Sequence, residues 1–100
     1  MGHTMPGYVY LIQPEGFNVY KVGTSIDPPR RLETLQRKRA ARLTIRAAIH
    51  YANGFGAEQW WHRKFAPHKL SGEWFALPES VVAEFCAIAE QQRAEVRAVE

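Results

Sequence analysis

The sequence predicts one small α+β domain, with a mostly antiparallel sheet of three to four strands flanked by helices in the order β-β-α-β-α-β-α. Segments rich in aromatic and β-branched residues alternate with segments in which apolar residues recur at helical spacing. The length of 100 residues suits a single core. We expect the domain over residues 7–100, with a C-terminal helix over 78–100 and a leader, compatible with a cloning origin, over 1–6.

The domain is expected to open with an antiparallel hairpin. The segment "GYVYLIQ" (7–13) is typical of a strand, and "PEGF" (14–17) is typical of a turn. The return strand is then "NVYKVGTS" (18–25), in which Lys21 stands where a strand that only filled a core would carry an apolar residue. Lys21 is therefore either a surface residue or a cation held for a function.

A helix is predicted over "IDPPRRLETLQRKRAA" (26–41). Asp27 is a suitable N-cap, and Pro28 suits the first helical position. Leu32 and Leu35 begin an apolar stripe on this helix. A third strand over 43–51, a helix over 57–66 that ends at Pro67, and a brief strand over 72–77 are expected next, followed by a helix that starts at Pro78 or Glu79. Asn53-Gly54 and Gly56 are expected to break the chain between the third strand and the second helix.

The composition favours a cytoplasmic protein. No apolar run reaches the length that spans a membrane, and no basic and apolar signal peptide opens the chain. The single cysteine, Cys86, excludes an internal disulfide and is expected to be a buried thiol.

Positive charge is concentrated in one segment. From Arg30 to Arg46 there are seven basic residues and one acid, a net charge of +6. From Ser71 to Glu100 six glutamates outweigh two arginines, a net charge of −4. A concentrated basic segment favours nucleic acid as a partner, although a solvated helix face gives the same pattern. The predicted DNA-binding residues are Arg30, Arg37, Lys38, Arg39, Arg42 and Arg46.

A second group of polar residues is spread over the predicted elements. It comprises Tyr10, Tyr20 and Lys21 on the hairpin, Arg31 on the first helix, and Glu58 with His62 on the second. Glu58 and His62 are four residues apart and share a helix face. Each residue taken singly suits an ordinary surface or half-buried position. We expect Tyr10, Lys21, Arg31, Glu58 and His62 to converge on one concave face.

These residues follow one another in an order that resembles the GIY-YIG nuclease superfamily. "GYVYLI" supplies Tyr10, "KVG" (21–23) stands at the second motif, Arg31 follows on a helix, and "AEQWWH" supplies Glu58. The resemblance is closest to a phage-type branch that reads Lys-x-Gly in the second motif and later carries Glu-x-x-x-His and a segment like "GEWF" (72–75). Two departures are Tyr8 at the glycine of the first motif and Lys21 at the tyrosine of the second. The resemblance implies a metal-dependent endonuclease, with Tyr10, Tyr20, Lys21, Arg31 and His62 as catalytic residues.

The residues allow a chemical role for each member of this group. Before Ser71 the acids are Glu15, Asp27, Glu33 and Glu58, so a single Mg²⁺ (or Mn²⁺) held by Glu58 is the metal site that this inventory permits. A zinc site would require His50 or His68 to converge on Glu58 and His62. Lys21 and Arg31 are candidates to favour the phenolate of Tyr10. Arg31 suits a phosphate, and His62 can move a proton or orient Glu58.

The leading hypothesis is a metal-dependent endonuclease domain that hydrolyses DNA phosphodiester bonds. The alternative is a non-catalytic DNA-binding module with the same fold. A protein-interaction domain would leave the basic segment unused. The chain is also compatible with a domain of a larger protein, and its oligomeric state is left open.

Overall fold

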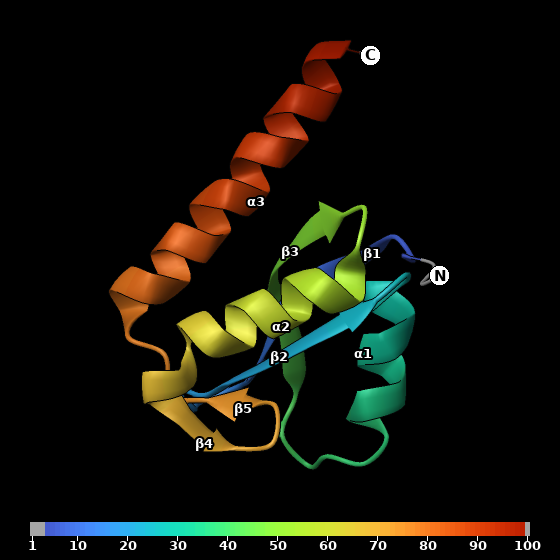
Figure 1. Ribbon diagram of the computed structural model, residues 1–100. Helices are drawn as coiled ribbons and strands as arrows, with labels where there is room; N and C mark the ends of the chain where they lie inside the picture. Colours follow the sequence, from blue (N-terminus) through green and yellow to red (C-terminus); the bar gives the residue numbers. More distant parts are fainter. Residues whose placement is uncertain (1–3, 100) are drawn as a thin grey trace.

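The computed structural model describes residues 4–99, so the first three residues of the expected leader lie outside it. Five strands and three α-helices make up this part of the chain (Figure 1). In chain order they are β1 (Gly7–Pro14), β2 (Tyr20–Ser25), α1 (Pro28–Gln36), β3 (Leu43–Tyr51), α2 (Gly54–Lys64), the 3₁₀ turn η1 (Ala66–His68), β4 (Lys69–Ser71), β5 (Trp74–Phe75) and α3 (Glu79–Val99).

The strands form one antiparallel sheet in the order β3-β1-β2-β5-β4. The α+β class is confirmed, but the expected three to four strands and their order are wrong, because β4 adds a fifth strand before β5. β4 has three residues, all exposed, so it lacks the alternation of buried and exposed residues by which a strand is recognised in a sequence. The expected strand over 72–77 shortens to Trp74–Phe75.

The sheet buries a separate apolar cluster on each face. In the pairing of β1 with β2, Tyr10 lies opposite Gly23 and Ile12 lies opposite Lys21, so these four residues share a face. Tyr10 and Ile12 pack there against α1. The larger cluster on the other face joins alternate residues of β1 and β2 to α2 and α3. Figure 1 shows α2 lying across the strands of the sheet.

Helix α1 begins as the sequence predicts and ends earlier. Asp27 caps it, because its Oδ1 accepts a hydrogen bond of 3.2 Å from the backbone N–H of Arg30. The helix ends at Gln36, whose side chain donates to the Ala41 carbonyl (2.9 Å) and accepts from the Leu43 N–H (2.7 Å). These two bonds close a loop over residues 37–42, so part of the basic segment lies on a loop instead of the expected helix.

Helix α2 begins at a position expected to be a break. Asn53 is its N-cap and accepts a hydrogen bond of 3.0 Å from the backbone N–H of Gly56. Gly54, the first helical residue, lies against β1, where an added Cβ would be 3.1 Å from the Cα of Gly7 and 2.9 Å from the Oγ1 of Thr24. The glycine therefore allows close packing here instead of ending an element.

Helix α3 crosses the outer edge of β3 and projects beyond the sheet (Figure 1). Where it crosses, Gln92 Oε1 accepts from the backbone N–H of His50 and Gln92 Nε2 donates to the carbonyl of His50, both at 2.8 Å. None of the helices in the described residues is both long and apolar enough to span a membrane.

Candidate functional site

The outer edge of β2 is only partly covered by its neighbour. β5 pairs with the first two residues of β2, Tyr20 and Lys21. The next residue, Val22, donates its N–H to the carbonyl of Glu73 at 2.9 Å. The carbonyl of Val22 lies 2.7 Å from Nε2 of His62, which donates to it and therefore carries the ring proton. Beyond the end of β5, helix α2 therefore supplies the hydrogen-bond partner for the edge of β2.

Glu58 lies one helical turn before His62 and is 7% exposed. Burial and the negative charge of Glu73 raise the pKa of Glu58 above its ordinary value. The charge of His62, a backbone hydrogen bond from Thr24 and the charge of Lys21 oppose this rise in pKa without cancelling it. A buried carboxylate beside a second carboxylate gains stability from a cation, which suits a metal ligand.

Tyr10 lies directly over Gly23 on the neighbouring strand. A Cβ at Gly23 would be 2.4 Å from the Tyr10 hydroxyl oxygen, so only glycine leaves room for this side chain. The hydroxyl is buried and has no hydrogen-bond partner in the described part of the chain. Burial raises the pKa of Tyr10, Arg31 lowers it, and Glu73 and Glu58 raise it further.

Arg31 lowers the pKa of Tyr10 as expected, but burial outweighs it, so the hydroxyl is neutral instead of a phenolate. Tyr10 packs with α1 on one face of the sheet, and Glu58 comes from α2, which packs with the other face. The charge of Glu58 still acts on Tyr10. The convergence of the five side chains on one concave face stays a prediction.

Lys21 is a partly buried cation with a defined partner. Its Nζ lies 3.1 Å from a carboxylate oxygen of Glu73 and 5.6 Å from the centre of the Trp74 ring. Arg31, exposed on α1, is the cation that lowers the pKa of Tyr10. Of the two cations expected to favour the phenolate of Tyr10, Arg31 lowers its pKa, and Lys21 forms an ion pair with Glu73.

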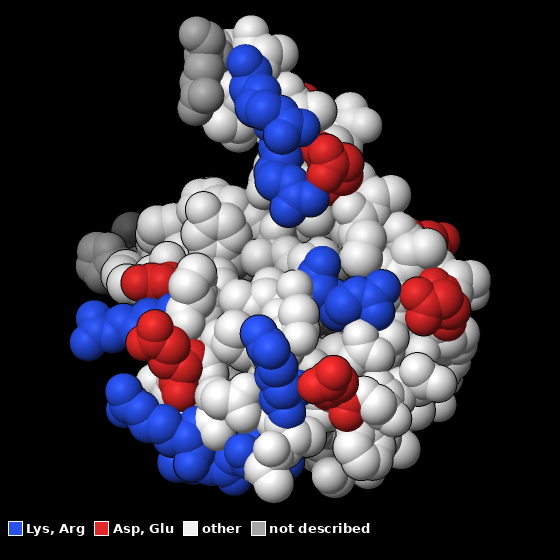
Figure 2. Space-filling model, turned by 180° about the vertical axis from the view of Figure 1, so that it is seen from behind, with Lys and Arg blue, Asp and Glu red and all other residues white. Residues whose placement is uncertain are grey.

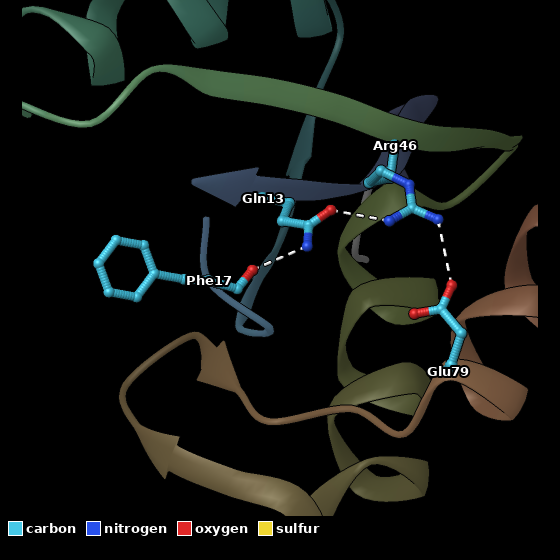
Figure 3. Close-up of polar contacts among 4 residues, drawn as sticks. All are labelled: Gln13, Phe17, Arg46 and Glu79. Atoms are coloured by element: carbon cyan, nitrogen blue, oxygen red, sulfur yellow. Dashed lines mark hydrogen bonds and ion pairs between the residues drawn. The ribbon is translucent and has the colours of Figure 1, made fainter. Parts of the chain in front are cut away.

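Tyr20 and Arg46 lie together on the opposite face of the sheet. A register shift between β1 and β3 leaves Arg46 between paired residues, and its guanidinium lies 6.0 Å from the ring of Tyr20. Arg46 donates to Gln13 (2.7 Å) and to Glu79 (3.4 Å), and Gln13 donates in turn to the carbonyl of Phe17 (Figure 3). These two residues are separate from the group around Tyr10.

The other cations of the basic segment are exposed on α1 and on the loop after it, namely Arg30, Arg37, Lys38, Arg39 and Arg42. Arg39 stacks on Trp74, with Cζ 4.8 Å from the ring centre. On the back face in Figure 2, one group of basic side chains lies at the lower left, on the side where Figure 1 shows α1. Further basic side chains follow the projecting helix, with acidic ones beside them.

The family of this chain follows from a comparison with models of known domains. The model of the T5orf172 domain matches residues 7–90. The chain belongs to the T5orf172 domain family. No curated protein and no solved structure gives a significant match. T5orf172 domains are phage-associated and resemble nuclease or DNA-binding domains.

The membership corrects the resemblance to the GIY-YIG superfamily, since T5orf172 is a different family. The motifs at Tyr10, at Lys21 to Gly23 and at Glu58 are short, and short motifs in the same order do not separate one family from another.

The donor atoms of this T5orf172 domain fit one class of metal. Within residues 4–99 no group of three or more His, Cys, Asp and Glu gathers, so the zinc alternative with His50 or His68 has no support. Mg²⁺ and Mn²⁺ typically take one or two carboxylates and fill their remaining positions with water and phosphate oxygens. Glu58, with Glu73 beside it, fits that pattern.

Glu73 is the site residue that the sequence argument misses. Only the acids before Ser71 were considered as metal ligands, whereas Glu73 lies after that point, between β4 and β5. The signal was present in "GEWF", where Glu73 precedes the tryptophan that pairs with Lys21.

Proposed function

We propose that this T5orf172 domain binds DNA and hydrolyses its phosphodiester bonds with one Mg²⁺ or Mn²⁺ held by Glu58. The proposal is supported by the charges of Arg31 and Glu58, which both act on the Tyr10 hydroxyl where it lies over Gly23 of β2. Exposed cations of α1 and the following loop lie on the same side of the sheet as Tyr10 and supply the charge that phosphates require.

Each side chain has a distinct task in this proposal. A bound divalent ion supplies charge relief at the phosphoryl oxygens and lowers the pKa of the attacking water. Arg31 forks onto a phosphate oxygen pair. Tyr10 is neutral and fully buried, so it acts on the phosphate through Arg31, the cation next to its hydroxyl. His62 donates from Nε2 to the Val22 carbonyl, which fixes the ring one helical turn after Glu58 and leaves Nδ1 as the ring nitrogen that can exchange a proton.

A non-catalytic DNA-binding domain is the second candidate, and one observation favours it. Glu58 and His62 already bond to backbone groups of β2, so both have a structural role at the sheet edge. A domain that only binds DNA would still use the α1 cations and would still need this edge closed.

Cleavage of supercoiled plasmid and of single-stranded DNA, with Mg²⁺ or Mn²⁺ and with chelator, separates the two candidates. The proposal expects nicked or linear product that requires the metal. DNA binding without cleavage of either substrate in either metal would establish the binding domain instead.

DNA binding itself is expected to depend steeply on salt. The logarithm of the binding constant should fall by about 0.9 per logarithmic unit of salt for each duplex phosphate neutralised. Changing Arg30, Arg37 and Lys38 together to Ala should therefore reduce that slope by about 2 to 3 and weaken binding equally for unrelated sequences. Fluorescence anisotropy at several salt concentrations measures both effects.

The matched control removes arginines from another surface. Arg93 and Arg97 lie on α3 and both pair with Glu90. Their double change to Ala should leave affinity and slope nearly unchanged. If this control weakens binding as much as the triple change, DNA does not contact the surface formed by α1 and the following loop.

A further inference from the structure

A pocket of about 410 Å³ lies at one end of the sheet, on the face covered by α1. Three segments far apart in the chain enclose it: the turn between β1 and β2, the loop after α1, and the hairpin of β4 and β5. Its lining is largely apolar, with Phe17, Val19, Leu43, Leu70 and Trp74 among the contributors, and Arg39 is its one charged lining residue among those described.

Two of these side chains are unusually exposed for their size. Phe17 is 59% and Leu70 is 58% exposed, and no part of the described chain covers them. Trp74 forms a third wall and already carries the planar guanidinium of Arg39 on its ring, with Cζ at 4.8 Å from the centre. A flat, aromatic ligand therefore finds stacking surfaces in the pocket and a cation at its rim.

The pocket lies next to the proposed cleavage site. Trp74 pairs with Lys21, which is two residues before Gly23, the residue under the Tyr10 hydroxyl. Glu73 precedes Trp74 in the chain and influences both Tyr10 and Glu58. Lys38 and Arg42 flank Arg39 in the loop and add positive charge for a backbone of phosphates. The volume is within the range of small-molecule sites, about 300–1,000 Å³.

We propose that this pocket binds one unpaired base of a DNA strand whose phosphates run past Lys21 toward Glu58. The inference rests on the proposed function, and it adds a substrate class: DNA with an unpaired base at or beside the bound phosphate. Stacking on aromatic side chains accepts any base, because every base has a π-face. The domain would therefore prefer single-stranded or distorted DNA over perfect duplex, without a strong sequence preference.

The test compares two labelled single-stranded oligonucleotides of equal length by fluorescence anisotropy. One carries ordinary bases, and the other carries abasic sugar-phosphate units. The wild type should bind the ordinary strand at least about tenfold more tightly, the size expected for one lost base stack. Phe17→Ala and Trp74→Ala should remove most of this preference while leaving binding of the abasic strand unchanged.

Trp60→Ala is the matched control. Trp60 is 49% exposed and also lies near a cation, Lys64 at 5.2 Å from the ring centre, but it is on α2 and outside the pocket. This variant should keep the wild-type preference. Phe17 is exposed in a turn, so its change to Ala tests the pocket even if Trp74→Ala fails to fold, which circular dichroism would show.

The outcomes separate this inference from the function on which it rests. Equal binding of the ordinary and abasic strands overturns the base pocket alone. A preference that survives Phe17→Ala and a folded Trp74→Ala overturns it as well. A free mononucleotide that competes as well as the oligonucleotide would make the pocket a nucleotide site and not a strand site. A protein that binds neither strand overturns the proposed function together with the inference.

Discussion

The Glu58→Gln variant is expected to lose DNA cleavage by at least about 100-fold while it keeps its fold and its DNA binding. A divalent ion contributes several kcal/mol of charge stabilisation to such a reaction, and about 3 kcal/mol corresponds to a factor of about 100. Glutamine has nearly the same shape and retains an oxygen for the backbone of Thr24. Rates of plasmid nicking at saturating Mg²⁺ or Mn²⁺ measure the effect.

The raised pKa of Glu58 gives this variant two further signatures. The carboxylate must be ionised to hold a metal, so the Mg²⁺ concentration that half-saturates wild-type cleavage should fall as the pH rises through a value above the pKa of an ordinary glutamate. Because the pKa is higher in the folded than in the unfolded state, ionisation of Glu58 destabilises the fold as the pH rises. Glu58→Gln should therefore be as stable as the wild type at neutral pH, or more stable. A less stable variant would show that the carboxylate mainly supports the sheet edge.

Tyr10→Phe is expected to stabilise the protein and to abolish most of its cleavage. The Tyr10 hydroxyl is buried without a hydrogen-bond partner in the described structure, and such a group costs about 1–3 kcal/mol. Removing it should raise the free energy of unfolding by about 1 kcal/mol. Loss of the hydroxyl that helps to position Arg31 should slow cleavage by about 100-fold. Urea unfolding and the nicking assay give the two values.

Tyr20→Phe, on a neighbouring strand of the same sheet, is the control for Tyr10→Phe. The hydroxyl of Tyr20 is also buried and unpartnered among the described residues, but it lies on the other face beside Arg46. Tyr20→Phe should raise stability by a similar amount and leave cleavage unchanged. Equal loss of cleavage in both variants would show that the effect spreads through the sheet and does not arise from the position of Arg31.

The sequence was informative where local chemistry decides the structure. The hairpin of β1 and β2, the cap at Asp27 and the strand over 43–51 depend on neighbouring residues and agree with the structure. β4 and the start of α2 were not predicted, because their structure depends on contacts with residues far away in the sequence. Gly54 looks like a breaker in the sequence, and its role becomes visible only when Gly7 lies against it.

The same distinction applies to the candidate site. Tyr10, Arg31 and Glu58 could be selected from the sequence, because their residue types suit phosphate chemistry and they influence one another in the structure. The alternation of side chains along a strand places Tyr20 on the other face from Lys21, and the structure has it there, in the larger apolar cluster. Glu73 enters the site through the short pairing of β5 with β2, which the sequence pattern does not reveal.

Gln92 affects whether the edge strand β3 can pair with another copy of this protein. β3 is an outer strand of nine residues, and the unpaired N–H and C=O groups of such a strand can recruit another chain into a growing sheet. The amide of Gln92 is chemically equivalent to a peptide group, and it occupies both hydrogen-bonding positions of His50. A strand from a second molecule would have to displace α3 before it could pair along the full length of β3. At His50, the helix that projects from the sheet therefore closes the edge of β3 to pairing with a strand of another molecule.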